Sequence, residues 1–136
     1  MKVKLDEGAF LPERAHVTDA GYDLRTPVCG TIPQRGFVVV DTGVHIQLPP
    51  GKAAVVISKS GLYTKHRITS TGLVDEGFTG SIRIGLENHS DEAYNFERGD
   101  KISQFYITDY YEYPIELVEK LDESDRGSDG FGSTGK

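Results

Sequence analysis

The stretch Phe37-Val38-Val39-Val40-Asp41-Thr42-Gly43-Val44-His45-Ile46-Gln47-Leu48 decides the fold class. It opens with a β-branched run, and its second half alternates apolar residues with His45 and Gln47. That period of two is typical of a strand with one buried face. The tripeptide at 41–43 is typical of a turn, so we expect two strands here, at 37–40 and 44–48.

The rest of the chain repeats this pattern of short apolar runs separated by turn residues. These runs predict further strands, at 53–57, 82–87, 102–107 and 117–118. One short helix is expected at 60–66, with Ser60 as its N-cap. Many short strands at close spacing are typical of an all-β barrel or sandwich.

Length and composition limit the function. The chain has 136 residues, the size of one domain, and its 37% hydrophobic and 26% charged residues exclude gross disorder. Its 15 Lys and Arg residues against 21 Asp and Glu residues give a formal charge of −6. Such a surface is a poor partner for duplex nucleic acid. A small anion or a metal-chelated ligand could still bind where a few cations meet.

The sequence carries no sign of membrane insertion or export. No apolar run approaches the roughly 20 residues of a membrane helix, and Met1–Glu7 lacks the apolar core of a secretory signal. The single cysteine, Cys29, rules out an intramolecular disulfide and suits a reducing compartment. We therefore expect a cytoplasmic protein with neither a membrane nor a nucleic acid as its partner.

The C-terminal residues differ in composition from the rest. We divide the chain into a β domain at 1–121 and a glycine-rich C-terminal arm at 122–136. Two interpretations of the arm stay open. A glycine-rich terminus is often disordered. However, the glycines, hydroxyls and aromatic ring of 130–135 could also meet phosphate oxygens and a base, so that the arm closes over a nucleotide as a lid.

Two acidic segments are candidates for chemistry. Asp19 and Asp23 lie four residues apart around a glycine, which fits either a turn or a carboxylate near a metal. Asp75 follows two apolar residues in the glycine-rich segment 72–80, which we interpret as a hairpin with Phe78 near its turn. A carboxylate there could accept a proton from water, or Asp75 could simply form the turn.

Two polar segments could hold an anion. Residues 58–61 precede the expected helix, where N–H groups, hydroxyls and Lys59 could meet a negative ligand, although plain N-capping is commoner. Gln104 lies among apolar residues, so its amide needs a backbone or ligand partner if it is buried. The four histidines lack zinc-ligand spacing, and neither a P-loop nor a nucleophile-elbow motif is present.

In their order and spacing these segments resemble the five motifs of the trimeric dUTPase family, the deoxyuridine triphosphate nucleotidohydrolases. The resemblance covers nearly the whole chain, and its five segments are 19–24, 59–62, 72–80, 98–104 and 126–135. It implies an all-β, jelly-roll-like barrel with one short helix. It also implies a homotrimer whose shared active sites are closed by swapped, flexible C-terminal arms.

The resemblance further implies the reaction. Water attacks the α-phosphorus of dUTP to give dUMP and pyrophosphate, which lowers dUTP and supplies dUMP for dTMP synthesis. Asp75 matches the aspartate that activates this water. Asp23 matches the acid that reaches the Mg²⁺ cofactor through water, and the triphosphate itself chelates the Mg²⁺.

The substrate contacts of the family fall on residues of fitting chemistry. Backbone groups would pair with uracil in the segment of Gly72, Leu73 and Val74, and Phe78 would lie under the sugar, leaving no room for a 2′-hydroxyl. The phosphate chain would meet Lys59, Ser60, Gly61 and Gln104. Arg83 lies where some members of the family approach the phosphates, and a solvated strand arginine is the other interpretation. The arm would add Arg126 at the terminal phosphate and Phe131, Gly132, Ser133 and Thr134 around the base.

Three residues depart from the family's motifs: Lys59 replaces arginine, Phe78 replaces tyrosine and Asp129 replaces glycine. The nearest alternative enzyme is deoxycytidine triphosphate deaminase, which needs a glutamate where this chain has Gly85. A regulatory module that binds a protein partner on the same scaffold is a second alternative. An inactive structural trimer is a third, and it is disfavoured because Asp75 and the fifth motif are present.

Overall fold

The computed structural model describes residues 1–125 and 127–128. Predicted contacts in the C-terminal arm therefore lie outside the described residues: Arg126, Phe131, Gly132, Ser133 and Thr134. Asp129 lies outside them as well. The fold thus bears on the first four motifs.

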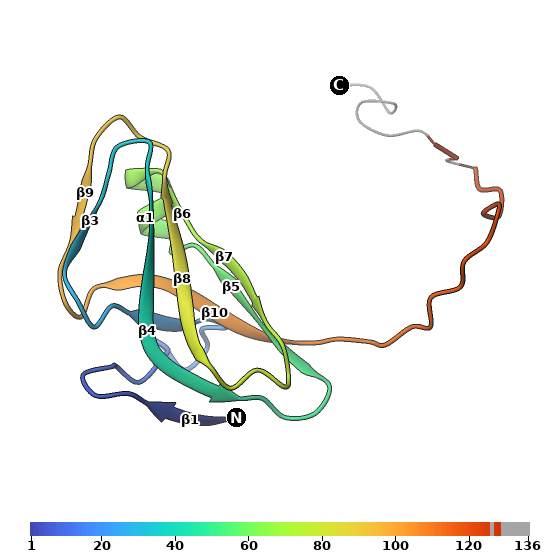
Figure 1. Cartoon of the computed structure of the whole chain (residues 1–136), viewed down its shortest axis with the longest axis horizontal. Coiled ribbons are helices and arrows are strands. Elements are labelled where there is room, and N and C mark those ends of the chain that lie inside the picture. The colour runs from blue at the N-terminus through green and yellow to red at the C-terminus, as the bar shows by residue number, and fades with distance from the viewer. Residues whose placement is uncertain (126, 129–136) are drawn as a thin grey trace.

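The described residues form ten strands and one short helix (Figure 1). In chain order these are β1 Lys2–Leu5, β2 Tyr22–Arg25, β3 Gly30–Ile32, β4 Phe37–Gln47, β5 Lys52–Ile57, α1 Ser60–His66, β6 Ile68–Thr69, β7 Thr71–Val74, β8 Ser81–Asn88, β9 Tyr94–Phe96 and β10 Lys101–Asp109. The predicted all-β class is confirmed, and the helix lies where the sequence predicts it.

The strands form two four-stranded antiparallel sheets and one two-stranded sheet. The first sheet has the order β1-β4-β8-β6, the second has the order β2-β10-β5-β7, and β3 pairs with β9. The sheets of the described chain do not close into a barrel. The jelly-roll-like architecture is therefore two packed layers rather than a closed cylinder.

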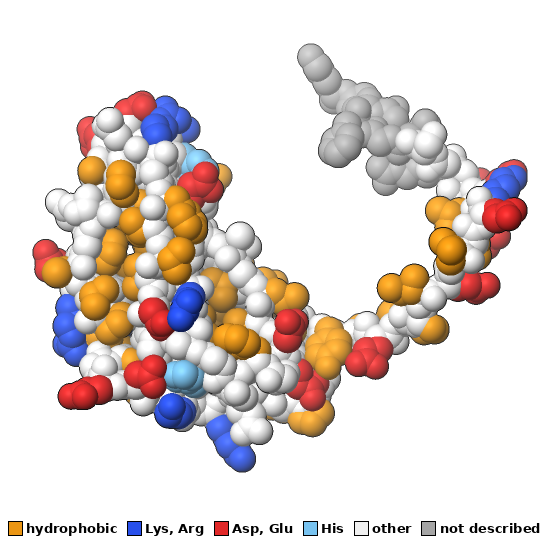
Figure 2. Space-filling view, viewed as in Figure 1, with side chains coloured by type: hydrophobic (Ala, Val, Ile, Leu, Met, Phe, Trp, Pro, Cys, Tyr) orange, Lys and Arg blue, Asp and Glu red, His pale blue; other side chains and the backbone are white. Residues whose placement is uncertain are grey.

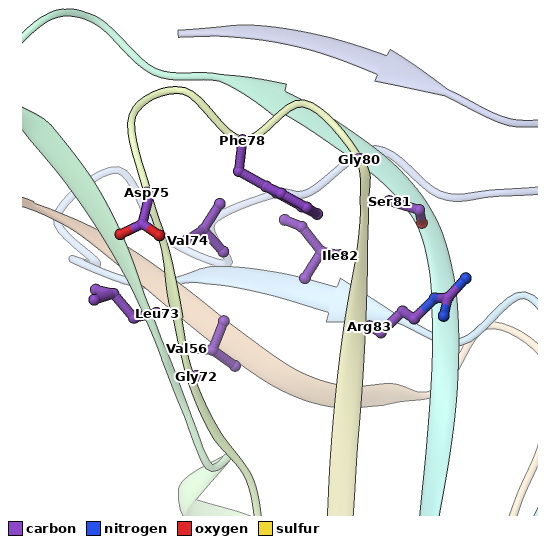
Figure 3. Close-up of a pocket in the computed structure, with 10 residues that line it drawn as sticks. All are labelled: Val56, Gly72, Leu73, Val74, Asp75, Phe78, Gly80, Ser81, Ile82 and Arg83. Atoms are coloured by element: carbon purple, nitrogen blue, oxygen red, sulfur yellow. The ribbon is translucent and has the colours of Figure 1, made fainter.

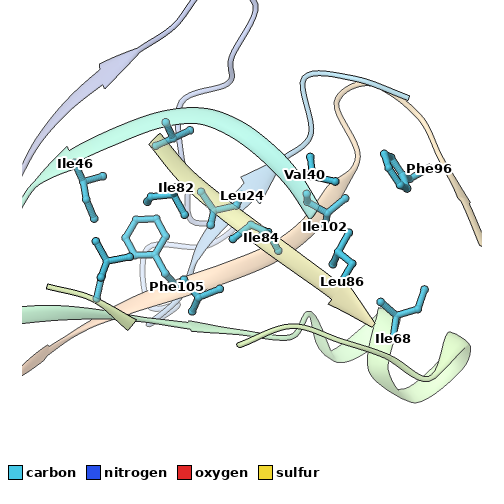
Figure 4. Packing of buried hydrophobic residues seen from close by; sticks show 14 of the residues in the cluster. Leu24, Val40, Ile46, Ile68, Ile82, Ile84, Leu86, Phe96, Ile102 and Phe105 are labelled. Carbon is cyan, nitrogen blue, oxygen red and sulfur yellow. The ribbon is translucent and has the colours of Figure 1, made fainter. Parts of the chain in front are cut away.

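The core lies between the two larger sheets (Figure 4). Ile82, Ile84 and Leu86 of β8 are at most 3% exposed and alternate with outward-facing residues, as the sequence predicts. Leu24 and Phe105 of the opposite sheet are fully buried. Because the inner face is filled by aliphatic side chains, Arg83 of β8 is left on its outer face.

Strand β4 is continuous, so the turn predicted at 41–43 is wrong. The pairing of β4 with β8 is irregular between Asp41 and His45. There Gly43 adopts φ +65°, and the buried Thr42 donates from Oγ1 to the Ile82 carbonyl at 2.7 Å. Such a bulge bends a strand without ending its pairing, which explains why a turn-like tripeptide stands inside one strand.

Helix α1 begins differently from the prediction. Its N-cap is Lys59, which is extended and makes no side-chain cap hydrogen bond, so the assignment of Ser60 as the N-cap is wrong. Arg67 ends the helix in the left-handed conformation, with φ 56°, and its N–H bonds to the Tyr63 carbonyl. Across the part of the chain that the structure describes, no helix is long and apolar enough to cross a membrane.

Beyond β10 the chain leaves the packed body as an extended segment that leads to the C-terminal arm (Figure 1). The strand predicted at 117–118 is wrong, because this segment has no regular structure and the side chain of Leu117 is 99% exposed. A strand needs a hydrogen-bonding neighbour, and no described strand pairs with this segment. The boundary between the domain and the arm at 121/122 stays a prediction.

An apolar patch lies on the outer face of the first sheet. Figure 2 shows hydrophobic side chains gathered over β4 and β8. Phe37 and Val39 are more than half exposed there. The Phe37 ring covers Gly85, where an added Cβ would lie 2.8 Å from the ring. Exposed apolar patches of this kind often mark contact surfaces.

Candidate active site

A pocket of about 530 Å³ opens between β7 and β8 (Figure 3). Its lining is Val56, Gly72, Leu73, Val74, Asp75, Phe78, Gly80, Ser81, Ile82 and Arg83. Six of the predicted site residues are thus brought together: Gly72, Leu73, Val74, Asp75, Phe78 and Arg83.

The two strands that flank the pocket belong to different sheets. Strand β7 pairs with β5, whereas β8 pairs with β4 and β6. The interpretation of 72–80 as a hairpin is therefore wrong, because its two sides are not hydrogen-bonded to each other. The separation of the strands is what creates a pocket where a hairpin would have filled the space with cross-strand pairs.

A tight turn places Asp75 and Phe78 at the mouth of this pocket. The Phe78 N–H donates to the Asp75 carbonyl at 3.1 Å. Figure 3 shows the Phe78 ring pointing into the gap, with Asp75 on the β7 side and Arg83 on the β8 side. Gly80 lies under the ring, and an added Cβ there would come within 2.6 Å of it. The ring therefore needs a glycine at that position.

The residue after Asp75 fastens the turn to the rest of the body. One carboxylate oxygen of Glu76 accepts hydrogen bonds from the Gly51 N–H and the Tyr110 hydroxyl, both at 2.7 Å. The bond from Tyr110, followed by that from Gly51, lowers the pKa of Glu76. Glu76 thus stays ionised as an anchor, and the exposed Asp75 carboxylate stands beside a turn held from behind.

A second cluster forms around Asp23 of β2. Its side chain is only 6% exposed, and it forms ion pairs with Lys59 and, at 2.6 Å, with the Lys101 ammonium. Burial raises the pKa of Asp23, but hydrogen bonds from Lys101 and Lys59 outweigh it and leave this pKa below its ordinary value. The cluster therefore combines an acid whose ionised form is favoured with two cations.

The first, second and fourth motifs meet at this cluster. Gln104 of β10 is the direct cross-strand neighbour of Asp23. Its amide nitrogen donates to the Ser58 carbonyl at 3.0 Å, so its partner in the structure is backbone. Its amide oxygen lies against Gly21, where an added Cβ would be 2.8 Å away. Ser60 is exposed nearby at the start of α1.

The cluster of Asp23, Lys59 and Lys101 is called the lysine cluster. It is separate from the pocket within one chain. Asp23, Gln104, Ile57 and Thr71 form one row across the second sheet. Asp75 stands four residues beyond Thr71, which is roughly 13 Å along the strand direction at the usual rise per residue. Neither Lys59 nor Gln104 lines the pocket. Of the predicted phosphate contacts, only Arg83 therefore shares the pocket with Asp75, the predicted general base, within one chain.

Arg83 lies at the rim of the pocket. It lines the pocket, and its guanidinium donates to Asp41 at 3.2 Å. Both side chains are at least half exposed, so the pair adds little stability and leaves the arginine able to exchange partners.

Lys101 is a functional candidate that sequence reasoning missed. It belongs to the fourth motif, but only the pairing of β10 with β2 reveals that it reaches Asp23. A lysine directly after the turn at 98–100 gave a weak signal, because a cation at a strand start is usually solvated.

A resident metal centre does not fit the residues described. No group of three or more His, Cys, Asp or Glu side chains converges among them. Asp23 is a single buried carboxylate whose two oxygens already face lysines, so only a contact through water suits it. A metal that arrives already chelated by a ligand is compatible with this donor set.

The protein is thus an antiparallel β structure with an acid at the mouth of the pocket and a lysine cluster at a separate place. That combination suits the class of hydrolases that act on phosphorylated ligands.

Comparison with known proteins defines the family. A model of the dUTPase family matches residues 8–135. The deoxyuridine 5′-triphosphate nucleotidohydrolase of Clostridium acetobutylicum is 42% identical over 135 residues, which cover 97% of this chain and 93% of that protein. The chain therefore belongs to the dUTPase family, whose enzymes hydrolyse dUTP. The family and the enzyme class predicted from the five motifs are confirmed.

Solved structures agree with this assignment. The dUTPase of Staphylococcus bacteriophage 80alpha with dUPNHPP matches with a TM-score of 0.91 and 28% identity, covering 99% of this chain and 98% of that one. A dUTPase variant from phage phi11 of S. aureus, solved to reveal the coordination of a structural Mg(II) ion, matches with a TM-score of 0.81 and 26% identity over 88% of this chain and 97% of that one.

Proposed function

We propose that this chain hydrolyses dUTP to dUMP and pyrophosphate by attack of water on the α-phosphorus. The observation that carries the proposal is Asp75 at the mouth of a pocket whose wall is the segment Gly72–Val74 and whose rim carries the Phe78 ring. A carboxylate at this position suits a general base. In the proposed step Asp75 takes a proton from water as the new O–P bond forms and the bond to the leaving pyrophosphate breaks.

Uracil recognition would rest on the backbone of Gly72, Leu73 and Val74. A slot lined by N–H and C=O groups discriminates by its donor and acceptor pattern, which a cytosine would not match. The Phe78 ring would lie under the sugar, where it leaves no room for a 2′-hydroxyl. Its missing hydroxyl, relative to the family's tyrosine, leaves this packing role unchanged.

The phosphate chain would be bound by Lys59, Ser60, Gly61 and Gln104, with Arg83 approaching from the pocket rim. Mg²⁺ would enter as part of the substrate, chelated by the triphosphate, and would neutralise part of its charge. Asp23 would meet this metal only through water. Lys59 and Lys101 flank the Asp23 carboxylate, which supports an anion binding here despite the overall charge of −6.

The proposed active site is shared between copies of the chain in a homotrimer. The separation of the lysine cluster from the pocket supports this, because the base site of one copy would need phosphate contacts from another. The exposed apolar patch of Phe37 and Val39 offers a contact surface. The arm, preceded by the exposed Ile115 and Leu117, would cross to a neighbouring copy and close over the ligand.

The reaction is tested by pyrophosphate release from each deoxynucleoside triphosphate, with and without Mg²⁺. We expect release from dUTP only, and much less of it without the metal. Release of ammonia from dCTP would instead support the deaminase. The chain has Gly85 where that enzyme needs a glutamate, which argues against it.

The biological setting belongs to the same proposal. Hydrolysis of dUTP would lower its level and supply dUMP for dTMP synthesis. The exposed, unpaired Cys29 is compatible with a cytoplasmic, reducing location.

A further inference from the structure

His45 joins the turn at 75–80 to the N-terminal segment. Its ring nitrogen Nδ1 lies 2.8 Å from the Thr79 carbonyl oxygen, and its Nε2 lies 3.0 Å from a carboxylate oxygen of Asp6. Thr79 stands between Phe78 and Gly80, the residues that form the rim of the pocket. One side chain of β4 therefore links the turn to the loop after β1.

The partners of His45 determine its protonation state. A backbone carbonyl oxygen can only accept a hydrogen bond, and so can an ionised carboxylate. Both ring nitrogens must then donate, which only the imidazolium can do. A neutral ring would turn a lone pair toward one of the two oxygens and lose that contact. The geometry is thus satisfied only by a charged histidine.

The surrounding charges favour the same state. Asp6 faces the ring from the segment after β1, while Lys4 of β1 lies 3.6 Å from Asp6 and opposes the effect only weakly. On the turn side only the Thr79 carbonyl faces the ring. Of the two direct cross-strand neighbours of His45, Ser81 of β8 is uncharged and Lys4 of β1 is the cation beside Asp6. The hydrogen bond to Asp6, followed by that to Thr79, raises the pKa of His45.

We propose that protonated His45 is a positioning residue that holds the 75–80 turn, so that the affinity for dUTP falls when His45 loses its proton. The effect on dUTP rests on the proposed function, whereas the protonation of His45 does not. Because His45 touches neither Asp75 nor the pocket, its loss would loosen the rim under Phe78 without removing the general base. We therefore expect KM to change more than kcat.

The first test is an NMR titration of the histidine ring nitrogens in the intact protein. Asp6→Asn is the matched control, because it removes the carboxylate that faces Nε2 and leaves the Thr79 carbonyl in place. His45 should keep two ring N–H groups to higher pH in the wild type than in this variant. Asp6→Asn should lower its titration midpoint by roughly one pH unit, since the neutral amide removes the opposite charge. A neutral His45 at pH 6 would overturn the proposal, whatever the protein hydrolyses.

The second test compares KM for dUTP across pH. In the wild type KM should rise by about fivefold as His45 titrates, the size expected for one lost hydrogen bond, while kcat should follow a separate profile. Asp6→Asn should move this rise to lower pH. Asp91→Asn, which breaks an exposed ion pair with Arg35, should leave it unchanged.

A third variant removes the charge of His45 and keeps one of its hydrogen bonds. His45→Gln can donate to only one of the two oxygens at any pH, so its KM should stay near the high-pH value of the wild type. A pH-dependent KM that persists unchanged in His45→Gln would contradict the proposal. If no deoxynucleotide is hydrolysed at all, the proposed function fails, while the NMR titration still decides the state of His45.

Discussion

At the scale of single residues, the proposed chemistry is divided between two acids in opposite surroundings. Asp75 is exposed at a pocket mouth, whereas Asp23 is buried and paired with Lys59 and Lys101. An acid that must accept a proton from water needs access to it. A buried charge pair is screened less than an exposed one. An acid that organises cations is therefore better held away from solvent.

Replacing Asp75 by asparagine tests its assignment as the general base. The amide keeps the size of the side chain but cannot accept the proton, so kcat should fall by roughly 10²–10⁴-fold. The binding of dUTP, measured by calorimetry, should change little, because the pocket walls remain. Turnover close to that of the wild type would rule out this role for Asp75.

Replacing Lys101 by methionine tests the contribution of the lysine cluster to stability. The variant leaves Asp23 with one cation and should lose about 1.5–3 kcal/mol of stability at pH 7, as expected for a lost hydrogen bond to a charged group. Lys52→Met, which breaks an ion pair with the mostly exposed Asp109, should cost less than about 1 kcal/mol. Equal losses in the two variants, measured by urea unfolding, would contradict the importance of burial.

The same variant also has an expected pH signature. Because the folded-state pKa of Asp23 is lowered, its ionisation stabilises the fold above the unfolded pKa, and this contribution is lost as pH falls through the folded value. Without Lys101 the folded pKa should move up toward the ordinary value. The acid-unfolding midpoint of Lys101→Met should therefore lie at higher pH than that of the wild type.

At the scale of elements, the sequence predicts the strands whose apolar residues alternate and misses those defined by pairing. The buried Ile82, Ile84 and Leu86 reveal β8. In contrast, β3 and β9 have three residues each, too few for a period to show. The residues of the pocket were predictable from their motif, but its two-sheet construction was not, because neighbouring strands can pair either with each other or with other partners.

The two-stranded sheet offers a packing test. Gly30 of β3 is paired with Phe96, which is 4% exposed, and an added Cβ would lie 2.5 Å from the ring. Because this buried ring has little room to move, Gly30→Ala should destabilise the fold by about 1–3 kcal/mol. Gly77→Ala is the control, since no atom lies within 4 Å of an added Cβ there. Thermal unfolding of both variants checks the difference.

The arm offers a test of function without loss of fold. Residues 111–125 are exposed in the structure, so the packed body does not depend on them for its core. A chain that ends at Asp125 lacks Arg126 and the rest of the fifth motif. It should unfold at the temperature of the full chain and lose roughly 10³-fold in kcat/KM, in line with the loss of an arginine that neutralises charge on the leaving pyrophosphate. A lower unfolding temperature would make the arm structural instead.

At the scale of the whole molecule, one chain keeps most of the predicted phosphate contacts apart from the proposed general base. The predicted phosphate contacts and the predicted base come from motifs that all resemble one family, yet the fold leaves Lys59 and Asp75 in different places. Motif order in a sequence says which residues act together, but it does not say whether they act within one copy. Only the register of β5, β7 and β10 reveals the separation.

Mixing two defective variants tests whether sites are shared. Asp75→Asn lacks the base and Lys59→Met lacks a phosphate cation, so each alone should be nearly inactive. If each site draws these residues from different copies, refolding an equal mixture should restore about one quarter of the sites, because each of the two donor chains is intact half of the time. The same variants refolded separately and then combined without exchange are the control. If both residues acted within one chain, no mixture would contain an intact site, and the mixed protein would stay as inactive as its parents.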